Sequence, residues 1–258
     1  MAKTTMSTVD RALSFLRYFS VHAPEIGLSE LARIAGYDKT TTLRSLTALE
    51  RNGFVEQDSI TKKYRLGLAP INLARIRERS FPIEAILKPH IQKLARDTGE
   101  TAHATLVAGT VLVTAFTYEP ERATRVFLDP SAPLPVHATA SGLAIAAHLP
   151  NPQSELLLGT APFESFTEQT PPNREEIAAL LHTIRASGHA RADQFYEADV
   201  IGTAVPFFSP SGLPVGAIAV AAVASRFDDN LSQRIIAALT SAGHDITKEL
   251  GGRRPESL

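Results

Sequence analysis

The sequence predicts a small helical domain completed by a β-hairpin, followed by a larger α+β domain. Three observations support this fold class. Apolar residues recur at helical spacing before Gly53, short alternating segments follow directly, and from Thr101 onward pairs of strands are interspersed with helices. The chain has 258 residues, enough for one large domain or two modest ones. Its hydrophobic content of 44% and charged content of 21% are typical of a folded globular protein.

The first part of the chain predicts three helices, spanning about 8–20, 30–35 and 39–52. Ser29 is expected to cap the second helix, and Gly36 is expected to end it. Gly53 stops the third helix, whose expected apolar face is Leu43, Leu46 and Leu49. Two short helices joined by a tight turn, the first of them packed on an earlier helix, form a helix-turn-helix.

A β-hairpin is expected directly after the third helix. The segments 54–56 and 64–66 alternate in polarity around a polar tip that contains Lys62 and Lys63. Phe54 and Leu66 can pack such a marginal hairpin against the helices. A hairpin with basic residues at its tip is a wing that can lie along a phosphate backbone, so the predicted domain is a winged helix-turn-helix.

The charges divide unevenly along the chain. Residues 1–80 carry 13 Lys and Arg against 8 Asp and Glu, a net charge of +5. Residues 81–258 carry 13 against 19, a net charge of −6. A basic first third on an acidic body is typical of a polyanion-binding module attached to another domain, although chance unevenness is the alternative.

The start of the third helix predicts contact with DNA. Three successive threonines after Lys39 are mediocre helix formers, whereas their hydroxyls and the helix N-terminus suit phosphate contacts. Lys39 and Arg44 are long enough to reach base edges. The alternative is that Asp38 or Thr40 is merely an N-cap and the remaining side chains are solvated. The full candidate set for DNA binding is Ser29, Lys39, Thr40, Thr41, Thr42, Arg44, Ser45, Lys62, Lys63 and Arg65.

The remainder of the chain predicts an α+β domain on a mostly antiparallel sheet, because its strands come in hairpin pairs between helices. Asn173 followed by Glu176 is typical of a capped helix start. The expected helices span about 83–99, 139–148, 174–187 and 229–251, and the expected strands 101–107, 111–118, 200–208 and 213–224.

These elements together resemble the IclR family of bacterial regulators. The resemblance runs through residues 9–13, 28–32, 39–46, 53–55 and 64–67, and then through 133–142, 201–206 and 215–220. It implies a domain of residues 1–67, a linker helix of 68–80, an effector-binding domain of 81–252 with a GAF-like fold, and a tail of 253–258. One departure is Leu143, where the family usually has lysine.

The resemblance also implies where a small effector binds. The implied site residues are His137, Ala140, Ser141, Asp193, Asp199, Val200, Gly202, Ala219 and Ala221. Backbone N–H groups at a helix N-terminus can hold a carboxylate without an arginine. The favoured effector is a small carboxylate or oxo-acid, with an aromatic acid second. Ala219 and Ala221 stand where family members often have serines, which leaves fewer polar partners. His103 is a further candidate for the pocket, with a structural role as its alternative.

The sequence contains none of the common enzyme motifs of nucleophiles, phosphate loops, dinucleotide sites and zinc proteases. It also has no cysteine, and its eight histidines lack metal-ligand spacing. We therefore expect no catalytic residue, no metal and no cofactor. Neither a membrane span nor a signal peptide is expected, so the expected location is the cytoplasm.

The expected partners are a double-stranded DNA operator, a small-molecule effector and further copies of the chain. Two or more chains are expected to associate through the linker helices as a homodimer or homotetramer. The alternative function is a DNA-binding protein whose C-terminal domain only oligomerises. The size of that domain, about 170 residues, exceeds what dimerisation requires.

Overall fold

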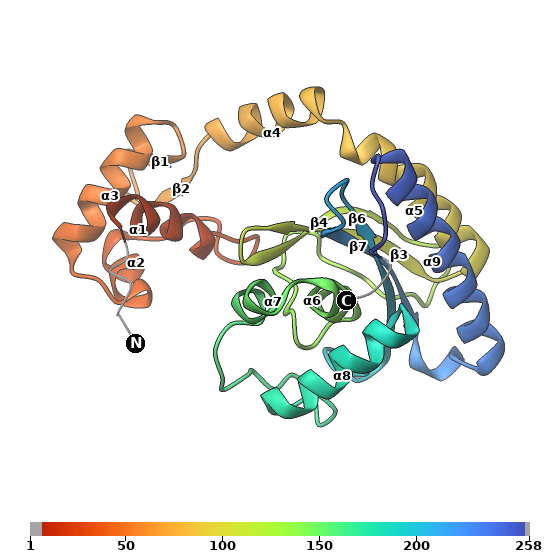
Figure 1. Ribbon diagram of the computed structural model, residues 1–258. Helices are drawn as coiled ribbons and strands as arrows, with labels where there is room; N and C mark the ends of the chain where they lie inside the picture. Colours follow the sequence, from red (N-terminus) through yellow and green to blue (C-terminus); the bar gives the residue numbers. More distant parts are fainter. Residues whose placement is uncertain (1–6, 256–258) are drawn as a thin grey trace. The chain divides into compact units, whose positions relative to one another are not determined.

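The computed structural model describes residues 7–255, and the chain divides after Pro82 into two compact units (Figure 1). The predicted helix-turn-helix domain followed by an α+β domain is confirmed. Residues 1–6 of the predicted first domain and residues 256–258 of the predicted tail lie outside the described residues. The elements of the first unit are α1 (Thr8–Ser14), η1 (Phe15–Tyr18), α2 (Leu28–Ala35), α3 (Lys39–Arg51), β1 (Val55–Gln57), β2 (Tyr64–Leu66) and α4 (Ala69–Ser80).

The core of the first unit joins its helices to the wing. Phe15, Leu31 and Leu46 are fully buried, one from each helical segment, and Val55 and Tyr64 add the two strands. The backbone of Tyr64 also exchanges two hydrogen bonds of 2.9 Å with Ile26. The hairpin is therefore stabilised both by its packing on the helices and by its backbone hydrogen bonds to Ile26. A two-stranded ribbon needs such contacts to be stable.

The predicted cap of α2 is wrong. The helix begins at Leu28 with Gly27 as N-cap, so Ser29 lies inside the first turn and its side chain accepts no capping bond. Gly36 ends the helix in the left-handed conformation at φ 72°, as expected.

Helix α4 buries none of its residues in the chain. Its apolar side chains Ile71, Leu73 and Ile76 are each about half exposed. Exposed apolar side chains on a helix, such as these, are typical of a segment that packs against another molecule.

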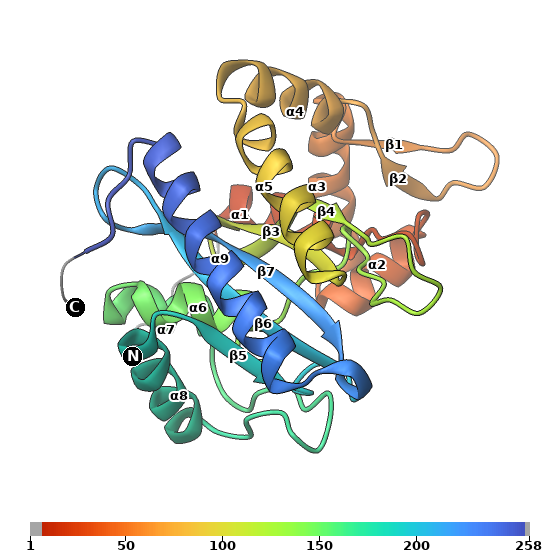
Figure 2. The ribbon, with the colours of Figure 1, turned by 90° about the vertical axis from the view of Figure 1, so that its right-hand side faces the viewer.

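The second unit is built on a five-stranded antiparallel sheet in the order β4-β3-β7-β6-β5 (Figures 1 and 2). The strands are β3 (Thr101–Ala108), β4 (Val111–Tyr118), β5 (Ala190–Asp193), β6 (Val200–Phe208) and β7 (Pro214–Val223). The helices are α5 (Ile83–Thr98), α6 (Ala140–His148), α7 (Asn151–Leu158), α8 (Arg174–Ser187) and α9 (Asp229–Glu249), with a short turn η2 (Ala224–Arg226).

Helices cover both faces of this sheet. On β7, Ile218 and Val220 pack with α5 and α9, whereas Ala217 and Ala219 face the layer of α6 and α8 (Figure 2). This alternation follows from the period of two in a strand. The small residues on the second face let α6, which is buried along its whole length, lie close to the sheet.

Gly142 fixes the start of α6. A Cβ at this position would lie 2.3 Å from the carbonyl oxygen of Val136, so only glycine permits this approach. The N-cap is Thr139, whose hydroxyl accepts from the Gly142 N–H at 3.2 Å and donates to the Pro135 carbonyl at 2.8 Å. The N-terminus of α6 is thereby held against the segment that precedes it.

Candidate effector pocket and DNA-binding surface

Helix α3 presents a polar N-terminal turn to solvent. Asp38 is its N-cap, with carboxylate oxygens that accept from the Thr41 N–H at 2.8 Å and the Thr41 hydroxyl at 2.7 Å. These hydrogen bonds lower the pKa of Asp38. Lys39, Thr40 and Arg44 are exposed around this capped turn. Asp38 therefore caps the helix, and the candidate DNA-contacting side chains Lys39, Thr40 and Arg44 are exposed beside it.

Two of the predicted DNA contacts are wrong. Thr42 is fully buried, and its hydroxyl donates to the Asp38 carbonyl at 2.9 Å, while Ser45 is 6% exposed. Both side chains face the core of the first unit beside Leu46. Leu43, expected in that core, is instead 43% exposed. The buried face of α3 therefore consists of Thr42, Ser45, Leu46 and Leu49.

The wing presents two lysines at an ordered tip. The Asp58 carboxylate accepts from the N–H groups of Ile60 and Thr61, and Lys62 follows in the left-handed region at φ 57°. Lys62 and Lys63 are both exposed. Arg65 is also exposed, but its guanidinium is engaged by two carboxylates, Glu56 at 2.6 Å and Glu25 at 3.4 Å.

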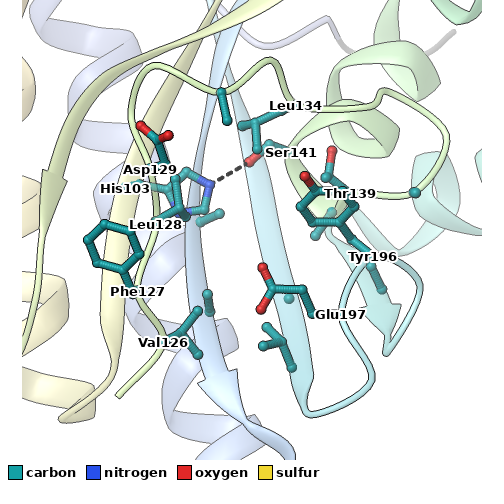
Figure 3. A pocket seen from close by; sticks show the side chains of 18 residues that line it. His103, Val126, Phe127, Leu128, Asp129, Leu134, Thr139, Ser141, Tyr196 and Glu197 are labelled. Atoms are coloured by element: carbon teal, nitrogen blue, oxygen red, sulfur yellow. Dashed lines mark hydrogen bonds between the residues drawn. The ribbon is translucent and has the colours of Figure 1, made fainter. Parts of the chain in front are cut away.

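A cavity of about 210 Å³ lies in the second unit beside the N-terminus of α6 (Figure 3). The central strands of the sheet form its floor, and the segment 126–134 and the loop before β6 form its sides. The lining residues are His103, Val126, Phe127, Leu128, Asp129, Ala132, Leu134, Ala138, Thr139, Ala140, Ser141, Ala192, Tyr196, Glu197, Val200, Gly202, Ala219 and Ala221.

Six of the nine expected effector residues line this cavity, namely Ala140, Ser141, Val200, Gly202, Ala219 and Ala221. The other three do not line it. His137 is buried against Phe163 and Phe166, and its Nε2 lies 2.8 Å from the Glu164 carbonyl oxygen.

Asp193 and Asp199, the other two expected effector residues, do not line the cavity. Asp193 accepts a hydrogen bond of 2.6 Å from Arg191 on the same strand. Asp199 has an exposed side chain, and its carbonyl accepts from the Ala224 N–H at 2.8 Å.

The expected set lacks the segment 126–134 and the pair Tyr196 and Glu197, which line the cavity. The segment contains no helix or strand, so no periodicity in the sequence indicates which of its side chains face inward. For Tyr196 and Glu197, the only signal in the sequence is that they are polar residues within the loop 193–199, which the resemblance already places at the site.

His103 and Ser141 meet at the bottom of the cavity. The Nε2 of His103 lies 3.2 Å from the Ser141 Oγ, and both residues are buried (Figure 3). Burial lowers the pKa of His103 to about 4, so the ring is neutral at pH 7. Its Nδ1 is buried without a hydrogen-bond partner in the part of the chain that the structure describes.

The electrostatics of the cavity come from the helix end and two carboxylates. The N–H groups of Ala140 and Ser141 belong to the first turn of α6, where they have no partner within the helix. Asp129 and Glu197 supply negative charge to the walls. Among the described residues that line the cavity, none is lysine or arginine.

Within residues 7–255, no group of three or more His, Cys, Asp or Glu side chains is arranged so that it could hold a metal ion. None of the helices in this range combines the length and the apolar character needed to cross a membrane.

Two family models match the chain. The IclR helix-turn-helix domain matches residues 8–59, and the bacterial transcriptional regulator IclR C-terminal domain matches residues 78–248. The regulator XynR of Escherichia coli K12 is 28% identical over 95% of this chain and 98% of its own length.

Solved structures agree with this assignment. A protein assigned as an IclR transcriptional regulator from Silicibacter sp. TM1040 is 37% identical, with a TM-score of 0.90 over 97% of this chain and 98% of that one. An IclR homologue from Microbacterium hydrocarbonoxydans, complexed with 4-hydroxybenzoate, is 23% identical over 95% of this chain and 99% of that one; its TM-score of 0.73 shows the shared fold. With both of its domains matched in order, this chain belongs to the IclR family of DNA-binding transcriptional regulators, which carry a C-terminal effector-binding domain.

Proposed function

We propose that this protein is a ligand-responsive regulator, in which a small organic acid bound in the C-terminal cavity changes the affinity of the winged helix-turn-helix for its operator. The observation that carries the proposal is the cavity at the N-terminus of α6, in the same chain as a helix-turn-helix whose helix α3 has an exposed N-terminal turn. A catabolic operon is the proposed target, and the proposed place of action is the cytoplasm, where bacterial DNA lies.

The acid is proposed to bind with its carboxylate at the start of α6. Two first-turn N–H groups and the Ser141 hydroxyl supply donors there, and the positive end of the helix dipole favours an anion. The neutral His103 ring beside Ser141 adds a further polar contact. The 4-hydroxybenzoate carried by one structural neighbour supports an organic acid of this size.

On the DNA side, Lys39, Thr40, Thr41 and Arg44 are proposed to contact the major groove. Ser29, exposed in the first turn of α2, is proposed as a phosphate contact. Lys62 and Lys63 are proposed to contact the phosphate backbone from the wing, and Arg65 is a weaker candidate because carboxylates engage it.

A dimer or tetramer is proposed to form through α4, whose side chains Ile71, Leu73 and Ile76 are each about half exposed. Pairing the chains presents two recognition helices to two half-sites, as a two-fold operator requires. The effector then favours one of two arrangements of the paired α3 helices. The resulting change in operator affinity cannot exceed the difference between the effector's affinities for the two arrangements.

A thermal-shift screen of the full chain against aliphatic and aromatic acids tests the proposal. A bound acid raises the melting temperature because it stabilises only the folded state. The stabilising acid is then added to a binding assay with duplexes selected from a random pool. If no acid stabilises the protein, the effector class is refuted, and a C-terminal domain that only oligomerises becomes the better account.

A further inference from the structure

Glu197 is a carboxylate in the cavity wall that has no protein partner among the described residues. Its carboxylate points into the cavity (Figure 3) and forms neither a hydrogen bond nor an ion pair within residues 7–255. Its neighbours Asp193 and Asp129 differ, since Asp193 is bonded to Arg191 and Asp129 accepts from Ser131. No cation among the lining residues offsets Glu197.

The Glu197 side chain is exposed, so solvent still reaches its carboxylate where it lines the cavity. Partial burial at the cavity wall nevertheless raises the pKa of Glu197, because the charged form loses part of its solvent there. Tyr196 lies next to it, and burial together with the charge of Glu197 raises the pKa of the tyrosine hydroxyl. A carboxylate in this setting repels a second anion and is stabilised by a group that donates a hydrogen bond.

The cavity therefore has two ends that favour opposite kinds of ligand group, one a hydrogen-bond acceptor and the other a donor. The N-terminus of α6 offers donors, while Glu197 offers an acceptor with a full negative charge. Apolar side chains such as Val126, Val200 and Ala221 line the space around them. A ligand that satisfies both ends of the cavity needs an acidic group at one end and a donor at the other.

We propose that Glu197 makes the pocket selective for acids that also carry a hydroxyl or ammonium group, so that the effector is a hydroxy acid or an amino acid rather than a plain carboxylic acid. This proposal rests on the proposed function of the cavity as the effector site. In the complex, the hydroxyl or ammonium donates to Glu197, and the ligand carboxylate lies at the start of α6, away from that charge.

Calorimetric titration of the full chain with matched acids tests the selectivity. The probes are benzoate with 4-hydroxybenzoate, and propanoate with 3-hydroxypropanoate and 3-aminopropanoate. A hydrogen bond to a charged acceptor predicts that the donor-bearing member of a pair binds roughly tenfold more tightly. Glu197→Ala should remove this preference in both directions, by weakening the donor-bearing acid and strengthening the plain acid, since the repulsion is also lost.

Two further variants separate charge from general damage. Glu197→Gln keeps an acceptor without the charge, so it should retain part of the hydroxyl preference and lose the ammonium preference. Asp199→Ala removes a carboxylate from the same loop but outside the cavity, and should leave every affinity unchanged.

The outcomes distinguish this proposal from the proposed function. If acids bind but members of a pair bind equally, or if Glu197→Ala weakens both members alike, Glu197 is not selective and the effector site stands. If none of the acids binds to the wild-type chain, the effector site itself is refuted, and the selectivity falls with it.

Discussion

The Nε2 of His103 on β3 lies 3.2 Å from the Oγ of Ser141 at the start of α6. This contact joins the central sheet to the helix N-terminus that we propose as the anion site. It brings together residues 38 positions apart in the sequence, both of them buried. The stability of the second unit and its ligand binding are therefore predicted to depend on this pair.

The first prediction concerns the pH dependence of stability. The pKa of His103 is about 4 in the folded protein and about 6.5 in the unfolded chain, so the unfolded state binds more protons between these values. Stability should therefore fall as the pH drops through this window, by roughly 2 kcal/mol between pH 7 and pH 5 from this group alone. The lowered pKa of His148 acts in the same direction.

Urea unfolding of the wild type and His103→Asn at both pH values measures this term. The variant should lose less stability than the wild type on going from pH 7 to pH 5. His182→Asn, which changes an exposed histidine on α8, is the control and should follow the wild type. An equal pH response in His103→Asn would show that His103 does not titrate as its burial implies.

The second prediction concerns the Ser141 hydroxyl. Ser141→Ala removes a donor beside the proposed carboxylate and should weaken the stabilising acid roughly tenfold. Operator affinity without the acid should stay unchanged, because the substitution lies in the second unit. Calorimetry and a DNA-binding assay give the two values, with the exposed Ser225→Ala as control. Unchanged acid affinity would mean that the ligand does not bind at this end of the cavity.

The third prediction separates base reading from phosphate contact. Arg44→Ala should reduce discrimination between operator and random duplexes, whereas Lys62→Ala with Lys63→Ala should weaken both alike and flatten the salt dependence. Fluorescence anisotropy at several salt concentrations measures both effects. Equal losses on specific and random DNA for Arg44→Ala would exclude its role as a base reader.

The fourth prediction concerns assembly through α4. Leu73→Asp with Ile76→Asp places charges on the exposed apolar side chains of this helix and should reduce the oligomer seen by light scattering. Operator affinity should fall with it, since half-sites are then bound singly. Leu156→Asp is the control, because this residue is also an exposed leucine, on α7. An unchanged oligomer would place the interface elsewhere.

Much of the fold was predictable because its signals are local. The caps at Asn173 and Gly36 determine helix ends through their own hydrogen bonds and backbone angles. Strand β5 and helix α7 were missed, since four and eight residues carry too little periodicity to identify them. The inner face of α3 was misjudged because Thr42 and Ser45 are polar yet buried.

The cavity was predictable only in part. Its helix end and strand residues follow from the family resemblance, which supplied Ala140, Ser141 and Ala219. Its other side comes from the segment 126–134, which folds across the sheet without regular structure. The position of such a segment depends on tertiary contacts, as in the hydrogen bond from the Thr101 hydroxyl to the Val126 carbonyl.

The central claim is that one ligand couples the cavity to DNA binding. The most direct test titrates the selected operator with the full chain at increasing concentrations of the stabilising acid. The account predicts that the acid changes the operator Kd, and that saturating operator changes the acid Kd by the same factor. An acid that binds the cavity and leaves the operator Kd unchanged would contradict it.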